Sequence, residues 1–193
     1  MPSFMKQAAW ALLPCLTLAV PAQAAEPRYT YAEIGYVNID FDDINEDGDG
    51  YGIGGSLAVH RNVHLLAQYQ DVDLGGDRDA SAASFGAGIN YALRPGLDVV
   101  ARLSYISAEL DSRRRGDRDE NGYGFEAGLR TMINPQLELN GGMRYVDVFD
   151  DNTSVFIGAL YDVVPNLALG GDLEFSDDIT VVFLKARYYF RGL

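Results

Sequence analysis

The 193-residue sequence is short of the side chains on which many enzymes and nucleic-acid-binding proteins depend. It contains one cysteine (Cys15), one tryptophan (Trp10) and two histidines. Lysine and arginine number 15 against 28 aspartates and glutamates, and Lys185 is the only lysine after residue 24. A lone cysteine excludes an internal disulfide and a multi-cysteine zinc site. The scarcity of bases excludes nucleic-acid binding, which requires clustered cations to neutralise phosphates.

The first 24 residues predict a cleaved secretory signal peptide. Lys6 precedes an apolar stretch from Ala8 to Val20, Pro21 ends it, and Ala22-Gln23-Ala24 offers small residues for cleavage. A lipoprotein signal at Cys15 is the alternative, which the preceding proline disfavours. Residues 25–193 then form one domain that carries all 28 acids and 14 of the 15 bases, a net charge of 14 − 28 = −14.

Four segments of this domain share two apolar alternations joined by a short turn. They are L-A-V-H-R-N-V-H-L at 57–65, Y-A-L-R-P-G-L-D-V at 91–99, T-M-I-N-P-Q-L-E-L at 131–139 and Y-D-V-V-P-N-L-A-L at 161–169. This pattern predicts β-hairpins. Longer polar loops are expected between them, at 37–50, 70–81, 107–121, 147–152 and 176–178. The result is an all-β fold of ten antiparallel strands; eight strands are the alternative. The ten strands are expected at 28–36, 51–59, 63–69, 82–91, 97–106, 122–133, 137–146, 153–163, 167–175 and 180–190.

Alternation within the strands gives the sheet one apolar and one polar face. In the segment 97–106, for example, Leu103 and Tyr105 share a face, whereas Arg102 and Ser104 share the other. Two closed barrels fit this pattern: a soluble carrier with its apolar face inside, and a transmembrane barrel with its apolar face towards lipid.

Three features favour an up-and-down transmembrane barrel. The polar face is rich in glycine, which would pack nothing on a water-exposed surface but makes room inside a narrow barrel. The apolar stretches span nine residues, for example 97–105, and a tilted strand needs about 9–11 residues to cross a membrane. Aromatic residues also stand at both margins of the apolar face, as in the girdles of such barrels. The predicted girdle consists of Tyr36, Tyr51, Tyr69, Tyr91, Tyr105, Tyr123, Tyr145, Tyr161, Tyr188 and Phe190.

The alternating strands, short turns, long loops and aromatic-rich last strand V-V-F-L-K-A-R-Y-Y-F resemble the small OmpA/OmpX-like, porin-like outer-membrane barrels. The resemblance implies a Gram-negative outer membrane, periplasmic N and C termini, and contact with outer-membrane lipids and lipopolysaccharide. It also implies insertion by the barrel-assembly machinery, which in these families is helped by a final aromatic residue. Here Phe190 is followed by Arg191, Gly192 and Leu193, a departure from that pattern.

Strand parity places charged side chains inside the barrel, where charges need partners. Glu126 and Arg144 are expected to face each other across the turn at Pro135, and Asp172 is expected near Lys185. The interior is either a salt-bridged plug or a conducting path; a ten-stranded barrel is just above the size that side chains can fill, and the plug is favoured. The predicted lumen charge network is Glu33, Arg102, Glu126, Arg130, Arg144, Asp172, Glu174, Lys185 and Arg187.

The five long loops hold 20 of the 28 acids and form an acidic rim. The stretch D-I-N-E-D-G-D-G at 43–50 resembles the start of an EF-hand, but Gly54 stands where the bidentate glutamate is required. We therefore expect no EF-hand and at most weak binding of divalent cations at these loops. Strand parity points both histidines, His60 and His64, inward at the short-turn end of the barrel. Enzymes among outer-membrane barrels usually need a base such as histidine near the outer leaflet, at the opposite end.

We predict no enzymatic activity, no cofactor and no catalytic or metal site. The expected function is that of a non-enzymatic outer-membrane protein, with a structural role in the envelope and adhesion or cell contact through the acidic loops. A narrow porin-like channel for small solutes or ions is the first alternative. A periplasmic barrel that binds a hydrophobic ligand is the second.

Overall fold

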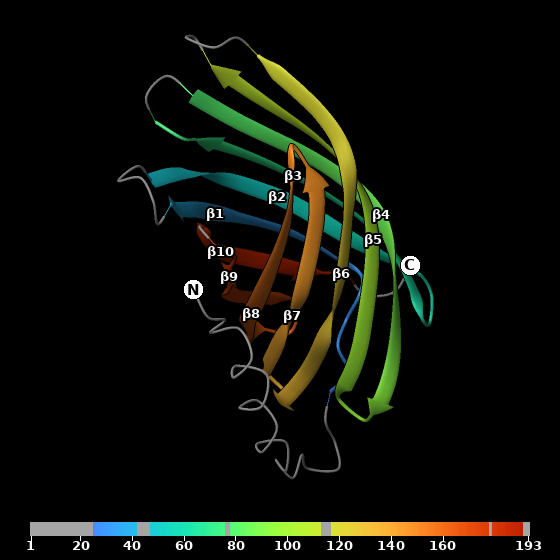
Figure 1. Ribbon diagram of the computed structural model, residues 1–193. Helices are drawn as coiled ribbons and strands as arrows, with labels where there is room; N and C mark the ends of the chain where they lie inside the picture. The colour runs from blue at the N-terminus through green and yellow to red at the C-terminus, as the bar shows by residue number, and fades with distance from the viewer. Residues whose placement is uncertain (1–24, 42–46, 76–77, 113–116, 178, 191–193) are drawn as a thin grey trace, which may run out of the picture.

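The computed structural model of the chain describes residues 25–41, 47–75, 78–112, 117–177 and 179–190. The signal peptide expected at 1–24 lies outside this part. The described residues contain ten strands that pair antiparallel in chain order, and β1 also pairs with β10, so the sheet closes into a barrel (Figure 1). The strands are β1 (Tyr31–Phe41), β2 (Asp47–His60), β3 (Val63–Asp73), β4 (Arg78–Arg94), β5 (Leu97–Ser112), β6 (Arg118–Asn134), β7 (Leu137–Val148), β8 (Asp150–Val164), β9 (Leu167–Phe175) and β10 (Ile179–Tyr189).

This architecture confirms the predicted ten-stranded antiparallel barrel. Closure provides every strand with two neighbours and leaves no edge, which is the condition for a sheet to lie in hydrocarbon. Among the described residues, the structure contains no helix of the length and apolarity needed to cross a membrane.

Several strands are longer than predicted and absorb most of the expected loops. β4 and β6 have 17 residues each, and a strand of that length tilted by 45° rises about 40 Å, more than the apolar band of about 25 Å. The predicted loop at 147–152 is a hairpin in which Val148 pairs with Asp150, and Phe149 between them has a φ of +63°. The sequence prediction was wrong here because Asp, Asn and Gly have low strand propensity and were taken to indicate loops. In the structure, strand pairing whose register is set in the apolar band continues beyond that band into the polar residues.

The four short turns share one irregularity. The register shifts by one residue in the strand before each turn, between Ala58 and His60, and at the equivalent places in β4, β6 and β8. Such a bulge reverses the facing of the residues that follow it. His60 is consequently exposed, which corrects the prediction that both histidines point inward, while His64 is only 1% exposed.

The apolar face of the barrel points outward, as the transmembrane interpretation requires. Leu103, Phe85 and Ile89 are each at least 60% exposed, whereas Arg130 and Gly88 are buried inside. Close approach explains glycine at Gly88, because a Cβ there would overlap the imidazole of His64.

Candidate functional site

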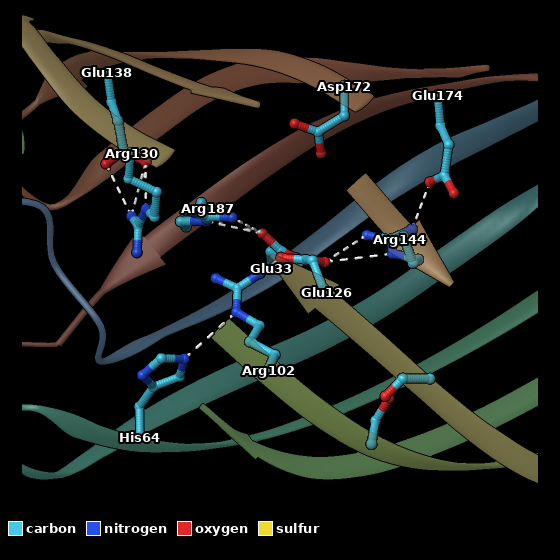
Figure 2. Close-up of polar contacts among 12 residues, drawn as sticks. Glu33, His64, Arg102, Glu126, Arg130, Glu138, Arg144, Asp172, Glu174 and Arg187 are labelled. Carbon is cyan, nitrogen blue, oxygen red and sulfur yellow. Dashed lines mark hydrogen bonds and ion pairs between the residues drawn. The ribbon is translucent and has the colours of Figure 1, made fainter. Parts of the chain in front are cut away.

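The barrel interior contains a layer of charged side chains at mid-height, which we call the charged layer. The structure places all nine residues of the predicted lumen network on the inward face, and they come from β1, β5, β6, β7, β9 and β10. Figure 2 labels all of them except Lys185. The layer comprises Glu33, Arg102, Glu126, Arg130, Glu138, Arg144, Asp172, Glu174, Lys185 and Arg187. Five carboxylates therefore face five cations.

Glu126 is the centre of one half of this layer. Its Oε1 lies 2.6 Å from Arg102 Nη1, and its Oε2 lies 2.9 Å from Arg144 Nη2. Arg144 reaches Glu174 at 2.5 Å with its other terminal nitrogen, and Ser154 donates a hydrogen bond to that carboxylate. The chain of contacts ties β5 through β9 together across the lumen.

Glu33 is the centre of the other half. It accepts from Arg187, with a closest distance of 2.7 Å, and its carboxylate lies 3.9 Å from the Lys185 ammonium. Lys185 also bonds to Asp172, although the ladder places Asp172 opposite Phe183 rather than opposite Lys185. The two-residue offset is bridged by the length of the lysine side chain.

Arg130 and Glu138 form the most enclosed pair. Two hydrogen bonds of 2.8 and 2.9 Å join the guanidinium to the carboxylate, and both side chains are 5% exposed. A bidentate geometry of this kind is needed to offset the cost of removing both charges from water.

A second layer closes the short-turn end of the lumen, and the sequence did not predict it. Residues 25–30 precede β1 and turn into the barrel mouth, so that the Tyr29 side chain is 8% exposed. Its hydroxyl donates to Asp98 at 2.8 Å, and its ring stacks on His64 at 4.8 Å between centroids. Burial raises the pKa of the Tyr29 phenol well above its usual value of 10.0, against the opposing effect of Arg130 and with the help of Asp98.

Arginine–aromatic contacts complete this closure, which we call the Arg–Tyr layer. It comprises Arg28, Tyr29, Tyr31 and Tyr189, together with Arg130 and Arg187, which it shares with the charged layer. Guanidinium carbons lie 3.5 to 4.5 Å from ring centroids in three pairs: Arg28 on Tyr189, Arg187 on Tyr31, and Arg130 on Tyr29.

Strand parity could have found Tyr31 and Tyr189, both of which occupy inward positions. Residues 28–30 had instead been assigned to the first strand, which begins at Tyr31. Parity in that expected strand puts Tyr29 on the face of Glu33 and Arg28 on the other face, but the predicted lumen network included neither residue.

The long-loop end of the lumen is apolar, whereas the predicted lumen network consisted of charged residues alone. We define an apolar layer of inward residues Val37, Val72, Ile106, Ala108, Val146 and Val181. Val37 is 1% exposed and Val72 is 5% exposed, so these side chains are shielded from water on the inside of the wall. The barrel thus has three interior layers: Arg–Tyr at the short-turn end, charged in the middle and apolar towards the long loops.

A cavity of about 350 Å³ lies between these layers. Its walls include Ile106 and Val146 of the apolar layer, Glu126 of the charged layer, and Arg130 and Glu138 where it meets the Arg–Tyr layer. Within the described chain, no group of three or more His, Cys, Asp or Glu side chains is arranged to hold a metal ion. His64 Nε2 accepts from Arg102 at 3.4 Å and its ring is covered by Tyr29, a structural environment for a histidine.

The outer face carries all ten predicted girdle aromatics. Tyr51 and Tyr69 neighbour each other at 6.4 Å between centroids, as do Tyr105 and Tyr123 at 5.8 Å, near the long-loop margin. Tyr188 and Phe190 lie 5.2 Å apart near the short-turn margin.

Acidic residues on strand extensions continue the outer face beyond the girdle towards the long loops. Several of them are exposed and directly opposed across the ladder: Asp40 with Asp47, Asp49 with Asp73, Asp73 with Asp79, Asp79 with Asp111, Glu109 with Asp119, and Asp147 with Asp151. Opposed like charges destabilise a ladder. Residues 42–46 of the EF-hand-like stretch and the arginines at 113–115 lie outside the described residues.

Comparisons with solved structures found proteins similar to this chain. An outer membrane channel from Pseudomonas putida F1 has a TM-score of 0.54 at 11% identity, over 88% of this chain and 98% of that one. The attachment invasion locus protein Ail of Yersinia pestis has a TM-score of 0.44 at 15% identity, over 86% of this chain and 100% of that one. Neisserial surface protein A has a TM-score of 0.42 at 15% identity, over 84% and 96%.

At 11% identity, the likeness to the Pseudomonas putida channel shows a shared fold alone. No curated protein matches the sequence. The model of the family described as outer membrane protein beta-barrel domain matches residues 9–178. Because this match covers most of the chain and the structure is a closed barrel with an apolar outer face, the protein belongs to the outer membrane protein beta-barrel domain family.

Proposed function

We propose that the protein is a non-enzymatic outer-membrane barrel with a closed interior, which serves the envelope structurally and presents an acidic surface for contact with other cells. The observation that carries this proposal is the network of paired charges that spans the middle of the lumen. Five carboxylates face five cations in the charged layer, and the Arg–Tyr layer covers the short-turn end. Ion pairs arranged in this way join the strands of the barrel, and we expect them to leave no open pore through the lumen.

A bilayer recording tests the closed interior. Purified protein, refolded in detergent and added to a planar membrane, should produce no discrete conductance steps at moderate voltage. Insertion is checked by protease protection of the barrel in vesicles of the same lipid. Frequent, stable steps from properly inserted wild-type protein would overturn the closed-barrel proposal.

The contact role assigns the strand extensions to the cell exterior and the N and C termini to the periplasm, after export by a cleaved signal peptide. Opposed exposed carboxylates such as Asp73 and Asp79 concentrate negative charge beyond the outer aromatic margin. Cell–cell aggregation of a strain expressing the wild type is compared with that of Asp73→Asn/Asp79→Asn/Asp111→Asn. Loss of the expression-dependent aggregation supports the role, and equal aggregation at equal surface levels contradicts it.

The same orientation defines the proposed surroundings. Lipid chains would contact the apolar band, and lipopolysaccharide would surround the acidic extensions, where divalent cations would reduce repulsion between opposed carboxylates. The barrel-assembly machinery would insert the chain.

A narrow channel is the second candidate, favoured by the 350 Å³ cavity inside the wall. A soluble carrier is not proposed, because Leu103 is 60% exposed on the outside and would have to line the cavity of such a protein.

A further inference from the structure

The segment before β1 is positioned to separate two hollows at the short-turn end. On the lumen side, the 350 Å³ cavity reaches as far as Arg130 and Glu138. On the other side, a second hollow is lined by Arg28, Met132 and Asp162. Arg130 donates a hydrogen bond of 3.2 Å to the backbone carbonyl of Arg28. A residue that lines the first hollow therefore contacts a residue that lines the second.

Contacts of this segment reach around the whole barrel mouth. Arg28 binds Asp162 of β8 at 2.5 Å and the carbonyl of Pro165 in the β8–β9 turn at 2.7 Å. Tyr29 stacks on His64 of β3 and reaches Asp98 of β5, a strand opposite the β1–β10 seam. The segment thus crosses the opening instead of lying along the wall.

The strand pairing of the wall does not depend on Arg28 or Tyr29. Pairing of β1 with β10 begins at Tyr31 with Tyr189, and pairing of β1 with β2 ends at Tyr31 with Ser56. The contacts of Arg28 and Tyr29 are side-chain hydrogen bonds, one ion pair and ring contacts. Their loss would leave every strand with both of its neighbours.

We propose that Arg28 and Tyr29 form a displaceable plug, and that the barrel conducts small cations when this plug is withdrawn. Withdrawal removes Arg28 from Asp162 and Tyr29 from Asp98. Among the described residues of the charged layer and the short-turn end, the inward charges that remain are seven carboxylates (Glu33, Asp98, Glu126, Glu138, Asp162, Asp172 and Glu174) and five cations (Arg102, Arg130, Arg144, Lys185 and Arg187). The exposed constriction is then net negative, which selects cations over anions.

This inference rests on the channel alternative and assigns it a gate and a class of solute. The apolar layer does not contradict it, because Ile106, Val146 and Val181 line the cavity rather than filling it. Conduction would be limited at the Arg–Tyr layer.

Planar-bilayer recordings compare the wild-type barrel with Tyr29→Ala, Arg28→Ala/Tyr29→Ala and the control Glu26→Gln. Glu26 belongs to the same segment, but its side chain is exposed. We expect the open probability to rise about tenfold or more in the Tyr29 variants and to stay at the wild-type level in Glu26→Gln. In a potassium chloride gradient, the reversal potential of the open variants should show preference for potassium.

A further variant tests the origin of selectivity. Asp98→Asn and Asp162→Asn in the Tyr29→Ala background should reduce the preference for potassium without closing the pore. Folding is checked by the gel mobility shift on heating that closed barrels show in detergent, so that a misfolded variant is recognised. If Tyr29→Ala fails to fold, it is replaced by Tyr29→Phe, which keeps the stacked ring. The expected rise in open probability is then smaller.

The outcomes separate the two proposals. Folded Tyr29 variants that are as silent as the wild type overturn the plug and leave the closed structural barrel standing. A wild type that already opens as often as Tyr29→Ala overturns both. Anion preference in the open variants overturns the cation assignment.

Discussion

Glu126 of β6 and Arg144 of β7 occupy directly opposed positions in the ladder, with Arg144 Nη2 2.9 Å from Glu126 Oε2. Each residue is nine positions from Pro135 in the intervening turn. Because Glu126 also binds Arg102 on β5, one carboxylate joins three adjacent strands. The interaction therefore depends both on the register of β6 and β7 and on the ion pairs that cross the lumen.

A double-mutant cycle measures this pair. Glu126→Gln, Arg144→Gln and the double variant are unfolded with urea in vesicles of a short-chain lipid. We expect a coupling energy of about 1–2 kcal/mol, since the residues share a network and Arg144 is partly exposed. Additive single effects within about 0.3 kcal/mol would show that the two side chains do not interact.

The enclosed Arg130–Glu138 pair should matter more than a pair at the surface. Glu138→Gln leaves a buried guanidinium without its carboxylate, and we expect a loss of about 3 kcal/mol in the free energy of unfolding. The matched control is Glu120→Gln, which breaks the exposed Arg118–Glu120 pair and should cost less than about 1 kcal/mol. Equal losses in the two variants would contradict the burial of Arg130.

Side-chain alternation made most of the wall predictable. A strict period of two, four related turns and glycine on one face were enough to predict ten strands, the outward girdle and the opposition of Glu126 and Arg144. These features depend on local geometry, since neighbouring residues on a strand must face opposite sides. The turn bulges, in contrast, depend on backbone conformation within the turn, and one of them moved His60 to the exterior.

The glycine pattern can be tested on two adjacent residues. Gly88 faces His64 in the lumen, whereas Ala87 faces outward from the same strand. Gly88→Val should cost about 2 kcal/mol or more, because the new side chain overlaps the imidazole. Ala87→Val should be neutral or slightly stabilising in lipid vesicles. If Ala87→Val were the less stable variant, residue 87 of β4 would have to face the lumen and residue 88 the lipid.

Interior layers were harder to predict than the wall. Tyr29 precedes the first strand, so no ladder determines its position, and it lies in the lumen only because His64, Asp98 and Arg130 provide partners from three other strands. The apolar layer was missed for a related reason. Val37 was assigned to a loop, and only the continued pairing of β1 with β2 and β10 turns it into the barrel.

Topology is tested by labelling single cysteines in a chain whose only native cysteine, Cys15, lies in the expected signal peptide. Asp47→Cys at the start of β2 should react with a membrane-impermeant maleimide added to intact cells. Gln136→Cys in the β6–β7 turn should react only after the outer membrane is permeabilised. Labelling of the Gln136 variant alone in intact cells would invert the proposed orientation.

Alkaline pH should weaken the closure at Tyr29. The groups that face its phenol are Asp98 and Arg102 of β5, Arg130 of β6 and the imidazole of His64 on β3. Because burial raises the pKa of Tyr29 above its usual 10.0, the neutral phenol stabilises the folded barrel fully below pH 10. This contribution is lost as pH rises towards the folded pKa, by about 1.4 kcal/mol per pH unit. Unfolding free energies of the wild type and Tyr29→Phe should therefore converge between about pH 10 and 12, whereas parallel pH profiles would place the phenol in water rather than against Asp98.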